Sequence, residues 1–153
     1  LTFGAFLSPF DLFFYSSNKM TEAKEYTWCF ACGKANPIGL KLEFERTDEE
    51  CSATFIPQRE HQSYDGRMHG GLISTLLDEV MGNYLYIATG KPAYTAKIEV
   101  RFRQPVFIGE KIKAVARLKR KKGRLVEMTA QIIKEDGVLA AEAEAKMMCE
   151  GDL

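Results

Sequence analysis

Hydrophobic side chains recur with two different periods along this chain. In residues 71–88 they return every three or four positions, which predicts one long amphipathic helix ended by Gly90-Lys91-Pro92. The predicted apolar stripe consists of Ile73, Leu76, Leu77, Val80, Tyr84 and Ile87. Elsewhere apolar and polar positions alternate, which predicts strands. These runs are residues 40–44 and 51–56 before the helix, and 94–102, 111–118, 125–133 and 138–148 after it.

Short turns at residues 122–123 and 135–137 join the later strands. Connections of this length do not allow a parallel crossover, so these neighbours are expected to be antiparallel. The helix must bury its apolar stripe, and the sheet is the only partner that the pattern offers. We therefore predict an α+β fold in which a curved antiparallel sheet of five to six strands wraps one long helix. The pattern does not fix the order of the strands.

The length of 153 residues fits one domain, which we place at residues 26–153, with residues 1–25 as an N-terminal extension outside the core. Residues 1–15 are apolar, but Pro9 and Asp11 interrupt them, and the run is too short to span a bilayer. No basic residue precedes it, so it does not resemble a signal peptide. We expect translation to start at Met20. The alternative is a short arm, residues 1–15, that docks on a partner.

Charge and cysteine content narrow the possible partners. Lys+Arg and Asp+Glu both total 21, so nothing in the net charge favours nucleic acid or an acidic membrane surface as a partner. The cysteines, Cys29, Cys32, Cys51 and Cys149, are too few for a disulfide framework, and we expect free thiols in the cytoplasm. The Cys29-x-x-Cys32 pair could be half of a zinc site, but the sequence shows no second pair of ligands. We expect turn-forming residues here and no metal.

The helix start is the first candidate for chemistry. Gly70 and Gly71 each lower helix propensity, so the presence of two glycines at a helix start suggests that close approach to the backbone is needed there. The first N–H groups of a helix lack intrahelical acceptors, and glycine lets a carbonyl oxygen approach them. They would form an oxyanion hole, commonly worth about 3 kcal/mol per donor in the transition state. The alternative is a tight entry turn without a catalytic role.

Asp78 is the second candidate. At about 100° per residue it points almost opposite the apolar stripe, on the face of Gly71, Ser74, Gly82 and Leu85. It is therefore expected to face solvent or another subunit, about 10 Å along the axis from Gly71. The alternative is an ordinary solvated carboxylate.

Three segments resemble one known family. Residues 68–79 are similar to the HGG…D signature of PaaI-type hotdog thioesterases, with Asp78 nine positions after His69. Residues 29–40 resemble the C-x-x-C-G-x-x-N-P-x-G-L opening found in part of that family, and residues 94–105 resemble its strand after the helix. Together the matches cover about residues 26–148 in the same order. The resemblance implies a hotdog fold and hydrolysis of an acyl-CoA thioester to a carboxylic acid and CoA.

The resemblance also implies roles for single residues. The N–H of Gly71 would polarise the thioester carbonyl, and Asp78 would be general base or nucleophile across a dimer interface. Thr95 would orient the attacking water, and His69 would fix the turn near the thioester. Several relatives carry an asparagine six residues before the motif histidine, where this chain has Ser63. Ser63 or the neighbouring Gln62 is expected to substitute for it.

Further residues are candidates for substrate binding. Gly70, Ser74 and Thr75 are expected to line the acyl pocket. The basic cluster of residues 119–124, through Lys121 and Arg124, is a candidate for the CoA phosphates, with Arg101 and Arg103 as rivals. A solvated hairpin tip is the alternative.

The expected partners are the acyl-CoA substrate and a second copy of the chain in a homodimer, which would pair again to a homotetramer. No cofactor is expected beyond CoA within the substrate, and no nucleic-acid or membrane partner. The main alternative is a hotdog module that binds acyl-CoA without hydrolysing it. A hotdog dehydratase or hydratase would need a differently spaced His/acid pair, and an interaction protein would use residues 1–15.

Overall fold

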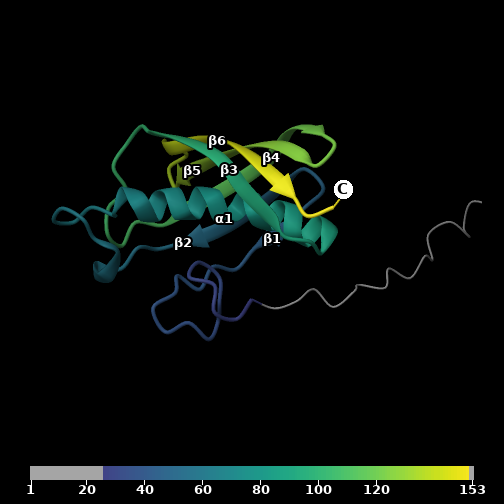
Figure 1. The fold of residues 1–153 in the computed structure, drawn as a ribbon. Coiled ribbons are helices and arrows are strands. Elements are labelled where there is room, and N and C mark those ends of the chain that lie inside the picture. Colours follow the sequence, from purple (N-terminus) through teal and green to yellow (C-terminus); the bar gives the residue numbers. More distant parts are fainter. Residues whose placement is uncertain (1–25, 152–153) are drawn as a thin grey trace, which may run out of the picture.

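One long helix lies against a six-stranded antiparallel sheet that curves around it (Figure 1). The computed structural model describes residues 26–151, so the proposed extension, residues 1–25, lies outside the described part. The strand order is β1-β2-β4-β5-β6-β3. The elements are β1 Glu45–Arg46, β2 Glu50–Phe55, η1 Arg59–His61, α1 Gly70–Thr89, β3 Ala93–Phe102, β4 Ile112–Lys122, β5 Leu125–Lys134 and β6 Leu139–Cys149. The predicted hotdog arrangement is confirmed.

The predicted helix is confirmed to within one residue at each end. Its first turn is capped by the imidazole of His69, and it ends at Gly90, whose φ of 67° lies in the left-handed region that favours glycine. The Gly90 N–H donates to the Tyr86 carbonyl and closes the last turn. Within residues 26–151, no helix combines the length and the apolarity needed to cross a bilayer.

The buried face of α1 is broader than the predicted stripe, and three residues were placed wrongly. Ile87 is 48% exposed, whereas Leu85, expected to point away from the sheet, is 2% exposed. Gly82, expected on the same outward face, lies over the sheet, because a Cβ there would be 3.8 Å from Met147 Cε. The physical reason is curvature: α1 packs against every strand from β2 to β6, so the sheet covers more than one stripe.

The strand predicted at residues 40–44 is wrong. Burial alternates there as expected, with Leu40 and Leu42 buried, but the backbone does not join the sheet. The Leu40 N–H donates to Phe30 and the Leu42 N–H to Ala31, both in the preceding loop. Lys41 between them has a φ of 57°, which interrupts an extended strand. The first strand is instead the short β1.

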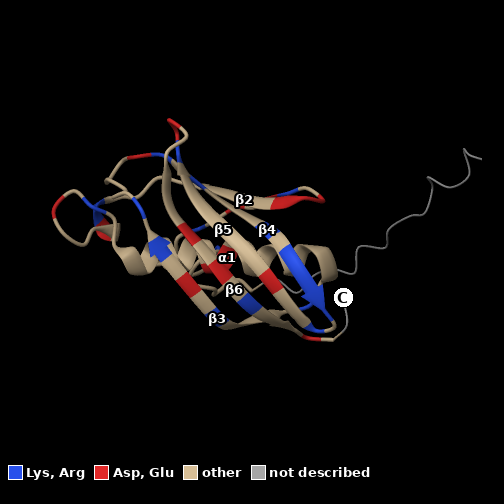
Figure 2. Cartoon of the chain, turned by 90° about the horizontal axis from the view of Figure 1, so that it is seen from above, with Lys and Arg blue, Asp and Glu red and all other residues tan. Residues whose placement is uncertain are grey.

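The other five strands are confirmed, with β4 running four residues further into the basic cluster than predicted. β3 is an edge strand that pairs with β6 alone, and most of its side chains are exposed. Acidic and basic residues are interspersed along the strands of the sheet (Figure 2).

A β-bulge interrupts the β3–β6 pairing between Thr95 and Lys97. Thr95 pairs with Met147 and Lys97 with Lys146, so Ala96 is the extra residue. A plain period of two would place the side chains of Thr95 and Lys97 on the same face. The bulge removes that constraint and frees Thr95 to turn toward the helix.

Candidate active site

The imidazole of His69 caps the start of α1. Its Nδ1 accepts a hydrogen bond of 2.9 Å from the Gly71 N–H. The Gly71 N–H, predicted to bind a thioester carbonyl, is thus already satisfied by His69. The Gly70 N–H, by contrast, has no acceptor among residues 26–151. The helix start therefore offers one unpaired donor, the Gly70 N–H, and one that already donates to His69, the Gly71 N–H, within residues 26–151.

A groove of about 280 Å³ opens beside Gly70. An added Cβ at Gly70 would lie 3.5 Å from the Phe102 ring, so the absence of a side chain leaves the backbone close to this wall. Two predicted substrate-binding residues, Ser63 and Arg103, line the same groove. The full lining is Ser63, Arg67, Met68, Gly70, Ile73, Phe102, Arg103, Gln104, Pro105 and Val106.

Asp78 and Thr95 are brought together from different elements. The Thr95 hydroxyl donates to Asp78 Oδ1 at 2.6 Å, a length typical of a charge-assisted O–H···O⁻ bond. The bulge after Thr95 allows this contact. Asp78 is half-buried against the edge strand of its own sheet, so the prediction that it faces only solvent or another subunit is wrong in this respect. The pair can hold a water molecule with the carboxylate as proton acceptor.

Comparison with known proteins identifies the family. The family model described as "Thioesterase superfamily" matches residues 65–141, half of the chain, including the helix start, Asp78 and Thr95. The chain belongs to the thioesterase superfamily. No curated protein matches this chain significantly.

Several solved structures share the fold of this chain. The E. coli PaaI protein of the phenylacetic acid degradation operon is 20% identical with a TM-score of 0.70, covering 79% of this chain and 85% of its own. A Streptococcus mutans UA159 protein bound to acetyl CoA is 20% identical with a TM-score of 0.66, covering 72% and 90%. A hypothetical thioesterase with coenzyme A from Streptococcus pneumoniae TIGR4 gives the same four values. At these identities the likeness establishes the fold.

The other predicted pocket residues, Ser74 and Thr75, do not reach the groove. The Ser74 hydroxyl donates to the Gly70 carbonyl at 3.0 Å, and the Thr75 hydroxyl donates to the Gly71 carbonyl at 2.9 Å. Both hydroxyls therefore bond within the helix, and neither residue lines the groove beside Gly70. In the described subunit they support the helix start.

The structure distinguishes between Gln62 and Ser63, the two candidates to substitute for the asparagine that several relatives carry before the motif histidine. The Gln62 side chain is used within its own turn, where its amide oxygen accepts from the Gly66 N–H and its nitrogen contacts Asp65. Ser63 is exposed and lines the groove. Ser63 is therefore the residue of the two whose side chain is available at the groove.

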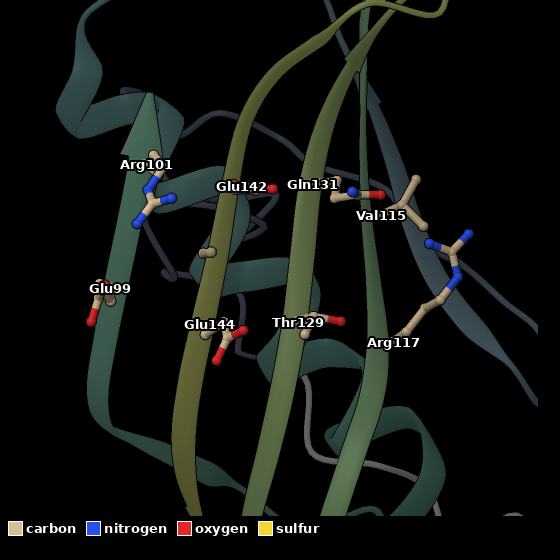
Figure 3. A pocket seen from close by; sticks show the side chains of 9 residues that line it. Glu99, Arg101, Val115, Arg117, Thr129, Gln131, Glu142 and Glu144 are labelled. Atoms are coloured by element: carbon tan, nitrogen blue, oxygen red, sulfur yellow. The ribbon is translucent and has the colours of Figure 1, made fainter. Parts of the chain in front are cut away.

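The two arginines at the end of β3 face different surroundings. Arg101 lines a groove of about 420 Å³ on the sheet face turned away from α1, together with Glu99 and Arg117 (Figure 3). Arg103 lines the groove beside Gly70 and is paired with Glu142, with 3.1 Å between Arg103 Nε and Glu142 Oε1. Of these two arginines, Arg103 is the one that lies near the helix start within one subunit.

Lys121 and Arg124 lie at the opposite end of the sheet. Arg124 Nε donates to the Cys149 carbonyl at 3.0 Å, and Cys149 pairs with Ala93, just beyond the C-terminal end of α1. Burial raises the pKa of the Cys149 thiol, and the charges of Lys121 and Arg124 oppose that shift. The length of α1, about 30 Å by the helix rise, separates this basic end from Gly70. Within one subunit it cannot share a small ligand with the helix start.

Sequence reasoning missed several residues of this region. Phe102, Arg67 and Gln104 line the groove but come from separate segments that only folding brings together. Glu79, next to Asp78, contacts Cys29, 50 residues away in the loop of residues 26–39, here called the opening loop. The available signal was its position on α1, where a step of about 100° turns it away from Asp78.

Proposed function

We propose that this thioesterase hydrolyses an acyl-CoA thioester to a carboxylic acid and CoA, with Asp78 as the reacting carboxylate. The observation that carries the proposal is the 2.6 Å hydrogen bond from Thr95 to Asp78 on the helix that the Gly-Gly turn begins. The superfamily match supports thioester hydrolysis as the general activity. CoA in similar folds supports the CoA part of the substrate.

The proposed reaction is an addition followed by an elimination. Asp78 accepts a proton from water held beside the Thr95 hydroxyl, and the water oxygen bonds to the thioester carbon. The carbonyl oxygen becomes an oxyanion that the helix-start N–H groups stabilise. The C–S bond then breaks, and CoA leaves as a thiolate that needs little acid assistance near neutral pH. In a variant of the same scheme Asp78 itself attacks and water hydrolyses the resulting anhydride.

His69 affects which N–H group acts as the donor. The Gly71 N–H can accept the oxyanion only when the imidazole turns away, because it now donates to His69 Nδ1. The Gly70 N–H needs no such displacement and borders the groove. We propose that both contribute, with His69 positioning the turn rather than transferring a proton.

We also propose that the active unit is a homodimer. Asp78 lies about 10 Å along the helix from Gly71, too far for one water to bridge within a subunit. The exposed edge of β3 carries Thr95 and can pair with β3 of a second copy. An antiparallel pairing would bring Asp78 of the partner subunit toward this helix start. It would also bring the partner's basic end, Lys121 and Arg124, toward the CoA phosphates; a homotetramer remains a further prediction.

Free-thiol release from a panel of acyl-CoAs tests the proposed function. The panel includes acetyl, medium aliphatic and aryl-acetyl groups, and binding of each compound is measured calorimetrically in parallel. We expect thiol release from at least one compound, with turnover proportional to dimer concentration. Binding without thiol release from any compound would overturn the proposal and favour the acyl-CoA-binding module.

A further inference from the structure

Cys29, Cys32 and Glu79 converge where the opening loop meets the middle of α1. Their two sulfur atoms and a Glu79 carboxylate oxygen all lie within 4.8 Å of one another, and all three residues are half-buried. Cys29 Sγ lies 3.6 Å from Glu79 Oε1. In Figure 1 the purple and blue opening segment runs below α1. None of these groups belongs to the proposed thioesterase site.

The loop is built to bring the two thiols together. The Gly33 N–H donates to the Cys29 carbonyl at 2.8 Å and closes a tight turn around Cys32. A Cβ at Gly33 would lie 2.4 Å from the Cys29 nitrogen, so only glycine fits. The Lys41 ammonium donates to the carbonyls of Gly33 and Lys34 at 3.1 and 2.9 Å, and also to that of Asn36. The loop therefore has a defined shape on the helix.

Glu79 is fixed in the orientation that the cluster requires. The Asn83 side-chain nitrogen donates to Glu79 Oε1 at 3.0 Å, the oxygen that also faces Cys29. Asn83 lies one turn further along α1 and is itself half-buried. A second residue that orients a carboxylate is a common feature of metal sites, because it reduces the cost of ordering the ligand.

The geometry around the thiols favours a metal over an isolated redox pair. A carboxylate oxygen of Glu79 lies within 4.8 Å of both sulfur atoms, so the cluster offers three ligand atoms and not only two thiols. A disulfide between the two cysteines would make no use of that carboxylate, whereas a divalent cation would bind it together with the sulfur atoms.

We propose that Cys29, Cys32 and Glu79 bind a divalent cation of the zinc class. Zinc prefers sulfur, nitrogen and carboxylate ligands in a tetrahedron. With a Zn–S bond of about 2.3 Å and a Zn–O bond of about 2.0 Å, the sulfur and oxygen ligands lie about 3.5 Å apart. The observed 3.6 Å between Cys29 Sγ and Glu79 Oε1 matches this spacing. Solvent supplies the fourth ligand, which revises the expectation of no metal.

The ion would fasten the opening loop to α1. Two of its ligands come from the loop and the third from the helix, so coordination links segments 47 to 50 residues apart. Binding releases the protons of both thiols and leaves a stabilised loop beside the helix that carries Asp78. The ion has no part in the proposed hydrolysis, and its site is testable without an activity assay.

Metal titration of the chelator-treated full chain tests this proposal. We expect one Zn²⁺ per chain by elemental analysis, and Co²⁺ substitution should give the absorption band of cobalt–thiolate charge transfer. Two thiols should become protected from alkylation, and the melting temperature should rise on metal addition. The Cys29→Ser/Cys32→Ser variant should lose binding, and Glu79→Gln should weaken it by at least about tenfold. Cys149→Ala is the matched control, because it also removes a thiol but leaves the site.

Three results would overturn the proposal. The first is no stoichiometric binding of Zn²⁺ or Co²⁺. The second is binding that Glu79→Gln leaves unchanged, which would make Glu79 a neighbour rather than a ligand. The third is a Cys29–Cys32 disulfide that forms readily in air while neither ion binds, which would identify a redox pair. Failure of thiol release from acyl-CoA would leave all three outcomes unaffected.

Discussion

Asp78 and Glu79 are adjacent carboxylates in the middle of α1, yet they face different parts of the molecule. Asp78 accepts from the Thr95 hydroxyl on the edge strand of the sheet. Glu79 accepts from Asn83 and lies against Cys29 of the opening loop. The helical step of about 100° separates the two side chains, so these neighbours in sequence contact different elements of the fold. The element that packs over each carboxylate on this helix therefore determines which groups that carboxylate contacts.

The largest expected effect is the loss of the Asp78 carboxylate. Asp78→Ala should lower turnover of the best acyl-CoA by at least about a hundredfold, as is typical when a general base is removed. The side chain is half-buried and outside the core, so the melting temperature should stay close to that of the wild type. Steady-state thiol release and thermal unfolding measure the two quantities. Turnover within a few-fold of the wild type would remove Asp78 from the mechanism.

Thr95→Val should have the next largest effect. Valine keeps the shape of threonine but removes the hydroxyl that donates to Asp78. We expect turnover to fall about tenfold, since a hydrogen bond to a charged group is worth about 1.5 kcal/mol or more. Thr95→Ser, which keeps the hydroxyl, should recover most of the rate. If serine and valine behave alike, the hydroxyl has no role in orienting water.

His69→Ala is expected to act mainly on stability. The variant removes the helix cap at the Gly71 N–H and should lower the free energy of unfolding by about 1 kcal/mol, measured in urea. Turnover should fall by less than the Asp78 variant, because the backbone donors at the helix start remain. A loss as large as that of Asp78→Ala would assign His69 a direct part in the reaction.

The smallest expected effect is that of Glu79 on the alkylation rate of Cys32. In chelator-treated protein, burial and then Glu79 raise the pKa of the Cys32 thiol, so its thiolate is scarce at pH 8. Alkylation of Cys32 should therefore be slower than that of a free cysteine and should speed up as pH rises. Glu79→Gln should increase the rate at pH 8, and peptide mapping by mass spectrometry measures it. An unchanged rate would mean that Glu79 does not affect the thiol.

Local sequence patterns predicted most of the fold, because the helix and five strands carry clear periods of three to four or of two. They failed where packing overrides the local period. Residues 40–44 alternate like a strand, but Lys41 adopts a positive φ and the segment bonds to the opening loop. Leu85 is buried because a curved sheet reaches around the helix. Neither effect has a signal in neighbouring residues.

In the candidate site, too, the sequence predicted some of the residues, whereas the contacts between them became visible only in the structure. The resemblance selected Asp78, Thr95 and the helix start, and the structure places Asp78 and Thr95 in contact through a bulge that no alternating pattern predicts. The convergence of Cys29 and Cys32 on Glu79 joins positions about 50 residues apart, and the sequence shows only the two cysteines. Contacts between distant segments were the part that required the structure.

The role of Asp78 as the reacting carboxylate is tested most directly by free-thiol release from the best acyl-CoA, compared between wild type, Asp78→Asn and Asp48→Asn. Both substitutions change an aspartate to its near-isosteric amide, and Asp48 is exposed in the loop before β2, away from the groove. We expect Asp78→Asn still to bind acyl-CoA but to lose at least about a hundredfold in turnover, whereas Asp48→Asn should behave as wild type. Equal turnover in all three proteins would contradict the assignment of Asp78 as the reacting carboxylate.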